Sequence, residues 1–431
     1  MVNHNPGRQP PEPLGTAARR AALRLLDAVL RRGEPLESAL ALATRALPGG
    51  PDRGLAHAIA AETLRRLPDL DALIDGATRM RLADDAKARF VLRIALVQVL
   101  ALRTPPHAAI ATVLPLVDGG PKRLVHGVFG SLMRGNAALP DVPTLPAAVA
   151  ARWGAAWGAD AVAGAARAIA VPPPLDLTLR DAGETDAWAA RLGGVSLAPG
   201  HVRVTDAGPI AALPGFDDGA WWVQDLAASI PARLLAGAGA DVLDLCAAPG
   251  GKSLQLAAAG HRVTAVDASE SRAARLFENR DRIGVAFDVV IGDVLDWAPD
   301  APADGVLVDA PCSATGIFRR HPDVLYRAHD GVVADMAALQ TAILARAADW
   351  VRPGGTLVYA TCSLERAEGE EQAARFLSAR ADFAVAPVQA AELPAGIAPT
   401  AAGFVRTVPG TLADAGGCDG FFVARFVRAS G

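Results

Sequence analysis

The stretch DVLDLCAAPGGKS, residues 241–253, decides the fold of this chain. Its first half is an apolar run typical of a buried strand, and AAPGG is a turn that leads into a helix. A strand, a glycine-rich turn and a helix in this order predict a parallel α/β sheet. Ligands of such a sheet bind at the carboxyl ends of its strands.

The turn matches neither standard phosphate-binding motif. A P-loop needs glycine five positions before its Gly-Lys pair, and Cys246 stands there; the GxGxxG pattern is also missing. A glycine-rich turn at a helix N-terminus still brings backbone N–H groups close to a ligand that carries a carboxylate. S-adenosylmethionine (SAM) has such a carboxylate and is therefore the candidate cofactor.

The chain beyond Ala240 alternates between strand and helix patterns, which favours a doubly wound sheet. A final run, GFFVARFV at 420–427, predicts a closing strand. The other expected strands are RVTAVDA (262–268), AFDVVIGD (286–293), DGVLVDAP (304–311) and TLVYATCS (356–363).

Three of these expected strands end in an acidic residue. Asp267 ends the second strand of the sheet, where a carboxylate commonly takes ribose hydroxyls. Asp293 is placed to address an adenine, and Asp309 ends the next strand. Any one of them could be a helix cap. Three acidic strand ends after one glycine-rich turn favour a nucleoside ligand.

The front of the chain has a different pattern. From Thr16 to about Gly135 apolar residues recur at helical spacing, which predicts five to seven helices. The linker LPDVPTLP precedes a helical stretch at 146–170, and residues 175–225 predict a small α+β piece. We expect a disordered lead at 1–14, a helical domain at 15–138, a linker helix with the α+β piece at 139–225, and the α/β domain at 226–431.

Charge is distributed unevenly. Residues 1–170 hold 21 Lys+Arg against 14 Asp+Glu, whereas the remaining residues hold 21 against 32. A basic front half suggests contact with a polyanion, although a solvated arginine-rich face explains the count equally well. Every long apolar stretch is interrupted by charge, and no apolar leader precedes the first helix. We therefore expect a cytoplasmic protein without a membrane span.

The four cysteines, at 246, 312, 362 and 418, predict neither a disulfide framework nor a metal site, because they form no CxxC or Cys/His spacing. Cys312 comes just after an expected strand and Cys362 at the end of the next one, so in a parallel sheet both thiols can face one substrate. A thiolate that adds to C6 of cytosine makes C5 nucleophilic enough to take a methyl group. A second group must then help to remove the C5 proton.

These motifs together carry a resemblance. DLCAAPGGKS, DAPCSATGIFRRHPD, LVYATCS and DGFFVARF closely resemble the 16S rRNA 5-methylcytosine methyltransferases of the RsmB (Sun/Fmu) group. The helical front, with LRIALVQVLALRTPPHAAI and KRLVHGVFGSLMRG, resembles the NusB-like RNA-binding domain of that group. The resemblance implies an all-α NusB-like domain followed by a Rossmann-like SAM methyltransferase domain, with the small α+β piece before it as a further RNA-binding part.

The resemblance also implies residue roles. Cys362 would be the nucleophile on C6, and Cys312 would assist product release as or through the general base. Arg319, Arg320 and His321 would contact phosphates or bases, with a solvated turn as the alternative. The cofactor residues would be Cys246, Ala247, Ala248, Pro249, Gly250, Gly251, Lys252, Asp267, Asp293 and Asp309.

The implied reaction is methylation of cytosine C5 in 16S rRNA, at position 967 in customary numbering, by a monomer that needs no metal. Two alternatives stay open: the same chemistry on tRNA or 23S rRNA, and a non-catalytic RNA-binding assembly factor. The chain departs from the group after TCS, where LERAEGEE replaces a Pro-Glu-Glu-Asn-like stretch, and at His126 and Gly127. Because of the first departure, the resemblance does not predict the loop on the substrate side.

Overall fold

The computed structural model describes residues 12–431, which form two compact units. The helical unit comprises the chain up to Ala147 together with His321–Arg327, and the sheet unit comprises Ala148–Arg320 and Ala328–Gly431. The expected disordered lead lies outside the described residues except for its last three positions. The domain boundaries expected from the sequence stay predictions.

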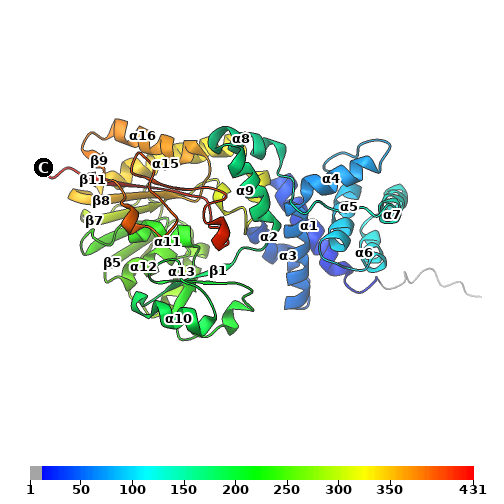
Figure 1. Cartoon of the computed structure of the whole chain (residues 1–431), viewed down its shortest axis with the longest axis horizontal. Coiled ribbons are helices and arrows are strands. Elements are labelled where there is room, and N and C mark those ends of the chain that lie inside the picture. Colours follow the sequence, from blue (N-terminus) through cyan, green and yellow to red (C-terminus); the bar gives the residue numbers. More distant parts are fainter. Residues whose placement is uncertain (1–11) are drawn as a thin grey trace, which may run out of the picture. The chain divides into compact units, whose positions relative to one another are not determined.

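Helices build the helical unit, as predicted (Figure 1). Helix α5 is its centre, since residues 88–98 of this helix are all buried. Apolar side chains of the other helices pack around it in one core. The helices are α1 (Thr16–Arg32), α2 (Leu36–Thr44), α3 (Gly50–Arg65), α4 (Leu67–Gly76), α5 (Lys87–Leu100), α6 (Pro106–Val113), α7 (Gly119–Arg134) and α14 (Val324–Arg327).

Part of the positive charge of the helical unit is internal. Arg89 is fully buried and forms ion pairs with Asp71 and Asp75. Arg93 is 3% exposed and donates two hydrogen bonds of 2.8 Å to Asp71. These arginines stabilise the core and are not available to a polyanion. The charge count of the sequence therefore overstates the basic surface of this unit.

The sheet unit begins with a helical stretch that differs from the prediction. One helix was expected at 146–170, but the structure has α8 (Ala147–Trp157) and α9 (Ala159–Ala170). Gly158 separates them with φ of 84°, a left-handed value that glycine adopts without steric cost and that no α-helix can contain. The small α+β piece that follows is confirmed, with β1 (Leu175–Leu179), α10 (Thr185–Leu192), β2 (His201–Val204) and β3 (Trp221–Val223).

A buried ion pair holds the small sheet, whose strand order is β2-β1-β3. Asp176 on β1 accepts hydrogen bonds of 2.6 and 2.7 Å from Arg203 on β2, and one of 3.1 Å from the backbone of Leu226. Burial alone would raise the pKa of Asp176, but the hydrogen bonds from Arg203 outweigh it and lower this pKa well below its usual range. Asp176 thus joins the small sheet to the helix that starts at Leu226.

The main sheet is mixed, with strand order β10-β11-β8-β7-β4-β5-β6 and β9 paired to β11. Strands β8, β7, β4, β5 and β6 are parallel as predicted, whereas β11 runs antiparallel to β8, β9 and β10. The strands are β4 (Asp241–Leu245), β5 (Arg262–Asp267), β6 (Asp288–Ile291), β7 (Ala303–Asp309), β8 (Val351–Thr361), β9 (Phe383–Val385), β10 (Val405–Thr407) and β11 (Phe421–Arg428).

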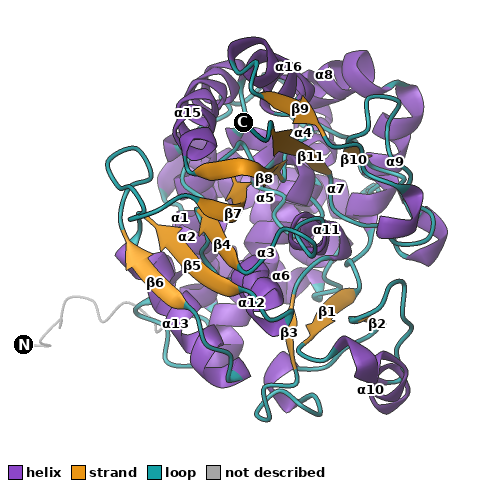
Figure 2. Cartoon of the chain, turned by 90° about the vertical axis from the view of Figure 1, so that its left-hand side faces the viewer, coloured by secondary structure: helices purple, strands orange, loops and turns teal. Residues whose placement is uncertain are grey.

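Helices cover both faces of this sheet (Figure 2). Alternate residues of each strand point to opposite faces, so the apolar residues of one strand pack against helices on both sides. Leu307 packs in the core shared with one set of helices, whereas its neighbours Val306 and Val308 pack in the core on the other side. The first set is α11 (Leu226–Arg233), α12 (Gly251–Ala258) and α13 (Glu270–Ile283); the second is α15 (Asp330–Asp349) and α16 (Glu370–Ala379). The expected closing strand is β11.

Helix α15 is the one helix of residues 12–431 whose length and apolar composition would suit a membrane span. Its Ile343, Leu344, Ala347 and Ala348 are buried in the core on the second face of the sheet. Packing against the strands therefore accounts for the apolar character of α15.

We predict that Asp176→Asn lowers the free energy of unfolding of the sheet unit by about 3–5 kcal/mol, because it leaves Arg203 buried without its counter-charge. All seven tryptophans of the chain lie between residues 153 and 350 and belong to the sheet unit. Urea denaturation followed by tryptophan fluorescence measures this effect. Asp186→Asn on the exposed side of α10 is the control and should change the value by less than about 0.5 kcal/mol. Equal stability of the two variants would contradict this role of Asp176.

Candidate active site

The two predicted thiols meet at the carboxyl ends of adjacent strands. Strands β7 and β8 pair in parallel with Asp309 opposite Ala360, so the chain leaves both strands at the same edge of the sheet. The sulfur atoms of Cys312 and Cys362 lie 3.5 Å apart. Both side chains are partly exposed, whereas the Ser313 and Ser363 that follow them are buried. The sequence placed the thiols at one edge; the structure shows them in contact.

A close backbone approach holds the loop that carries Cys312. The N–H of Gly316 donates to the carbonyl of Cys362 at 2.9 Å, and its own carbonyl accepts from Gly420 at 2.9 Å. A Cβ atom at position 316 would lie 1.9 Å from the carbonyl oxygen of Gly420. Only glycine fits here, and this explains the Gly of the ATGIF motif.

Two thiols of this region, those of Cys312 and Cys246, have a pKa above the ordinary value of cysteine. The hydrogen bond with Cys362 and burial raise the pKa of Cys312 well above its ordinary value, so Cys312 is a neutral thiol at pH 7. Burial, with Asp309 and Asp267 adding to it, raises the pKa of Cys246 to about 12. Cys246 therefore contributes to the site as a small apolar residue and not as a nucleophile.

The glycine-rich turn lies between β4 and α12. Cys246 takes a left-handed backbone conformation with φ of 61°, and the N–H of Ala247 donates to the carbonyl of Val266 on β5 at 3.0 Å. The Ser253 hydroxyl donates to the buried Asp244 carboxyl at 2.5 Å and ties α12 to the end of β4. The N-cap of α12 is Gly250, and this described helix end has no side-chain cap and no acidic residue in its first turn.

Asp267 ends β5 and contacts the glycine-rich turn, whereas Asp293 lies two residues beyond the end of β6. Asp267 is fully buried and accepts 3.0 Å hydrogen bonds from the N–H of Ala248 and from the guanidinium of Arg272. The N–H of Gly292 donates to the carbonyl of Asp267 at 3.0 Å, which brings the turn with Asp293 beside β5. Asp293 is exposed and accepts a hydrogen bond from the N–H of Leu295.

Lys252 links the turn to the thiol edge. Its Nζ lies 2.6 Å from a carboxylate oxygen of Asp309 and 5.5 Å from the ring centre of Phe421. Burial opposes the charge of Lys252, but Asp309 outweighs it and raises the pKa of this amine, and Cys362 contributes in the same direction. Lys252 is therefore a buried cation between the Gly-rich turn and Cys362.

The expectation that Arg319 contacts RNA is wrong. Arg319 is 3% exposed; its guanidinium lies 3.1 Å from Asp225 and 3.1 Å from Asp419, and donates to the carbonyl of Gly416 at 2.9 Å. Arg319 is thus part of a buried network of ion pairs that holds the loop after Cys312 in place. Arg320 also pairs with Asp225 but is 27% exposed, so its contact with RNA stays a prediction.

His321 belongs to a different compact unit from Arg319 and Arg320. It is part of the helical unit, to which the short segment His321–Arg327 contributes α14. Its expected contact with RNA also stays a prediction.

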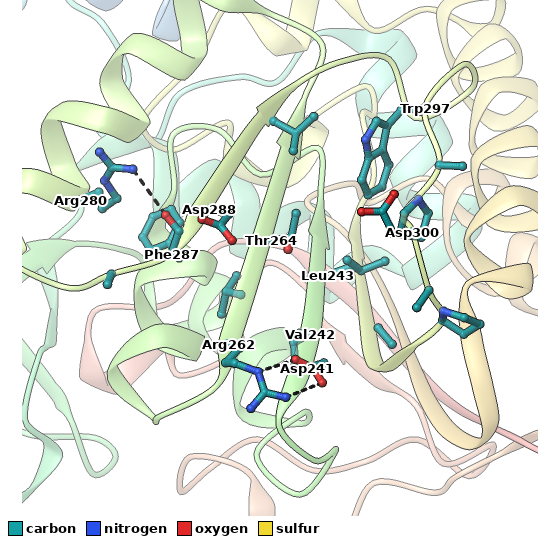
Figure 3. A pocket seen from close by; sticks show the side chains of 18 of the residues that line it. Asp241, Val242, Leu243, Arg262, Thr264, Arg280, Phe287, Asp288, Trp297 and Asp300 are labelled. Carbon is teal, nitrogen blue, oxygen red and sulfur yellow. Dashed lines mark hydrogen bonds and ion pairs between the residues drawn. The ribbon is translucent and has the colours of Figure 1, made fainter.

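Two cavities lie near the strand ends, and only one belongs to the site. The larger, about 1100 Å³, opens at Asp241 and Arg262, the first residues of β4 and β5, and therefore lies toward the amino ends of the strands (Figure 3). The smaller, about 330 Å³, has Gly251, Lys252 and Asp309 in its wall, together with Trp222 and Gln224 of the small sheet region. The smaller cavity is the one beside the predicted chemistry.

Sequence reasoning missed two buried carboxylates of this site. Glu368 accepts hydrogen bonds from both serines that follow the cysteines, and Asp225 pairs with Arg319. Asp225 lies in no recognisable motif, whereas Glu368 falls in the LERAEGEE stretch that replaces the Pro-Glu-Glu-Asn-like stretch of the group. Among residues 12–431 no cluster of His, Cys, Asp or Glu is arranged to hold a metal ion.

Comparison with known proteins agrees with this arrangement. The family model of the 16S rRNA methyltransferase RsmB/F matches residues 233–427, and that of the NusB family matches residues 16–127. Ribosomal RNA small subunit methyltransferase B of Xylella fastidiosa is 36% identical over 438 residues, which cover 96% of this chain and 98% of that protein. The chain belongs to the RsmB/F family of 16S rRNA methyltransferases.

A further relative agrees with this family, and two solved structures agree with the fold. The Klebsiella pneumoniae protein of the same name is 33% identical over 95% of this chain and 98% of its own length. The crystal structure of PH0851 has a TM-score of 0.71 at 21% identity and covers 95% of this chain and 98% of that chain. A methyltransferase homolog protein from Pyrococcus horikoshii has a TM-score of 0.54 at 23% identity, over 69% of this chain and 98% of its own.

The contact between the thiols predicts a change in reactivity. Removing the hydrogen-bond partner by Cys362→Ala should lower the pKa of Cys312, because that hydrogen bond is the largest cause that raises it. At pH 8, below that raised pKa, the thiolate fraction and hence the iodoacetamide alkylation rate of Cys312 should rise about tenfold for each unit by which the pKa falls. Peptide mass spectrometry across pH 7–10 measures this rate, with Cys418→Ser as the control. An unchanged pH profile would contradict the interpretation.

Proposed function

We propose that this chain transfers a methyl group from SAM to C5 of a cytosine in 16S rRNA, at position 967 in customary numbering. Membership of the RsmB/F family supports rRNA as the substrate class and SAM as the methyl donor. The observation that carries the C5 chemistry is the 3.5 Å contact between Cys312 and Cys362 beside the Lys252–Asp309 pair. Two thiols beside one acidic group suit covalent activation of a pyrimidine and its later release.

The cofactor fits the turn between β4 and α12. The uncapped first turn of α12 offers backbone N–H groups and the positive end of a helix dipole to a carboxylate, and Lys252 adds a charge. Asp267 would accept ribose hydroxyls in place of Arg272, which is 58% exposed and can move away. Asp293 would lie at the adenine side. When bound there, SAM supplies an electrophilic methyl group on its sulfonium.

Cys362 would be the nucleophile. Its thiolate adds to C6 of the target cytosine, and C5 then carries the electron density that attacks the methyl group. Lys252 and Asp309, an ion pair of 2.6 Å, both lie in the wall of the cavity of about 330 Å³. This assignment leaves Cys312, the thiol with the raised pKa, for a different step.

Cys312 would assist release. After methyl transfer the C5 proton must leave before the Cys362–C6 bond can break by elimination, and the sulfur of Cys312 lies 3.5 Å from that of Cys362. Cys312 would take part in this proton removal as or through the general base. The products are the 5-methylcytosine nucleotide, the demethylated cofactor and a proton.

RNA must present the cytosine unstacked, because C5 and C6 are not reachable within a helix. The cavity of about 330 Å³ at Lys252 and Asp309 would lie along its path. The helical unit and the small sheet would hold the flanking RNA, mainly through phosphates. We expect the protein to be a monomer that needs no metal. Light scattering at two concentrations tests the oligomeric state, and an activity assay in the presence of a chelator tests the metal requirement.

We predict that Cys312→Ala, incubated with SAM and protein-free 16S rRNA, accumulates a covalent RNA–protein adduct on a denaturing gel. The C6 bond forms in this variant, but its release is slowed. Adding Cys362→Ala should abolish both the adduct and methyl transfer. Cys246→Ala is the matched control, since burial keeps that thiol protonated, and it should form no adduct.

Other outcomes would contradict the proposal in distinct ways. Methyl transfer by the Cys362→Ala variant at the wild-type rate would exclude Cys362 as the nucleophile. Methylated cytosines mapped only in tRNA or 23S rRNA after reaction with total RNA would replace the substrate. Failure of the wild-type protein to methylate any of these RNAs would favour the non-catalytic assembly factor.

A second prediction concerns the helical unit. Lys122 and Arg123 are exposed on α7, so reversing both charges to Glu should weaken binding to 16S rRNA. For every phosphate that the variant no longer binds, the slope of log K against log salt should also become shallower by about 1. Filter binding from about 50 to about 300 mM KCl measures this slope. Arg352→Glu at the amino end of β8 is the control, and an identical slope for all three proteins would contradict the assignment.

A further inference from the structure

A buried carboxylate that the proposed mechanism does not use lies behind the two cysteines. Glu368 ends the short 3-10 helix Arg366–Glu368 after β8 and is 0% exposed. Burying a carboxylate is costly unless hydrogen bonds compensate for the missing water. Four donors surround Glu368: the N–H and hydroxyl of Ser313, the hydroxyl of Ser363 and the side-chain amide of Gln340.

The serines that Glu368 binds are the direct neighbours of the two cysteines. The N–H of Ser313 donates to Oε1 of Glu368 at 2.8 Å, and the hydroxyls of Ser313 and Ser363 both donate to Oε2. The two hydroxyl oxygens consequently lie 3.1 Å apart. One carboxylate therefore fastens the Cys312–Ser313 turn to the Cys362–Ser363 turn.

This connection is needed because β7 and β8 end before the cysteines. The parallel ladder stops near Asp309 and Ala360, so the positions of the two thiols depend on contacts beyond the sheet. Farther along, two hydrogen bonds join the loops: the N–H of Gly316 donates to the carbonyl of Cys362, and the N–H of Leu364 donates to the hydroxyl of Thr315. Glu368 supplies the link at the cysteines themselves.

Glu368 is itself held in a fixed orientation. Nε2 of Gln340 on α15 donates to Oε1 of Glu368 at 3.1 Å and to the carbonyl of Pro311 at 2.9 Å. The hydroxyl of Tyr359 on β8 lies 2.7 Å from the backbone carbonyl of Glu368 and 3.1 Å from Oε1 of Gln340. The side chains of Glu368, Gln340 and Tyr359 are fully buried, so the carboxylate is part of the protein interior.

We propose that Glu368 is a positioning residue that sets the distance between the Cys312 and Cys362 thiols. The inference rests on the proposed function, in which Cys362 adds to C6 and Cys312 must then reach the same nucleotide for release. Glu368 does not contact the reacting atoms. It fixes both Cys-Ser turns to one anion, and charge-assisted hydrogen bonds of this kind hold geometry better than neutral ones.

The test variant is Glu368→Gln, which keeps the shape of the side chain but removes its charge and one of its acceptor oxygens. The burial-matched control is Glu365→Gln. Glu365 is 5% exposed and its carboxylate binds Arg152 and Trp153, away from both thiols. Tryptophan fluorescence and thermal melting check that each variant is folded.

The first measurement needs no RNA. Diamide oxidises two neighbouring thiols to a disulfide, and mass spectrometry follows the Cys312–Cys362 cross-link over time. Wild-type protein and Glu365→Gln should cross-link at the same rate, whereas Glu368→Gln should be about tenfold slower because its turns move independently. A wild-type rate in folded Glu368→Gln would overturn the proposal, whether or not the protein methylates RNA.

The second measurement separates positioning from a general structural role. With SAM and 16S rRNA, Glu368→Gln should show a covalent adduct that survives denaturation although Cys312 is intact, because release depends on the thiol distance more than addition does. A uniform loss of methyl transfer without any adduct, in a protein whose wild-type form is active, would overturn the proposal. If wild-type protein is inactive on this RNA, the proposed function fails and the cross-linking rate alone decides the role of Glu368.

A second variant covers poor folding of Glu368→Gln. Ser313→Ala keeps the carboxylate and the backbone hydrogen bond to it and removes only one hydroxyl. It should slow cross-linking in the same direction by a smaller factor, about threefold. Wild-type cross-linking by Ser313→Ala, together with unfolded Glu368→Gln, would reduce Glu368 to a folding residue and overturn the proposal.

Discussion

The parallel pairing of β7 with β8 is the constraint on which the site depends. Because both strands run in the same direction, the chain leaves them at one edge, and the residues after Asp309 and Thr361 must share the same space. The 3.5 Å contact of the thiols follows from this geometry together with the buried links behind it. An antiparallel arrangement would have placed the two cysteines at opposite ends of the sheet.

Buried ion pairs and hydrogen bonds fix the loops that extend beyond the ends of the strands. Glu368 fastens the two Cys-Ser turns, and Arg319 with Asp225 and Asp419 holds the loop after Cys312. Burial, with Asp225 next to it, raises the pKa of Asp419 to about 7. Such networks are costly to form and strongly destabilising to break. They fix the loops that carry Cys312 and Cys362 relative to each other.

The prediction from sequence was most successful where a local pattern carries the information. Helical periodicity located the front helices, and the apolar runs after Ala240 located the strands. It was wrong for Arg319, because an arginine beside a motif looks the same whether it faces solvent or two buried carboxylates. It missed Glu368, whose partners Ser313 and Ser363 lie 55 and 5 positions away in the chain. The antiparallel pairing of β11 could not be predicted either, because an apolar run has the same hydrophobicity pattern whichever way the strand runs.

The sequence by itself determined the family, the cofactor class and the residue types of the site, because each motif is a short run whose chemistry is local. DLCAAPGGKS carries its own turn and helix start, and each of the two cysteine motifs carries its own thiol. Only the tertiary structure decided that the two thiols touch, which arginine is buried and which carboxylate joins the two cysteine turns. These properties arise from distance and burial, which depend on the packing of segments that are far apart in the chain.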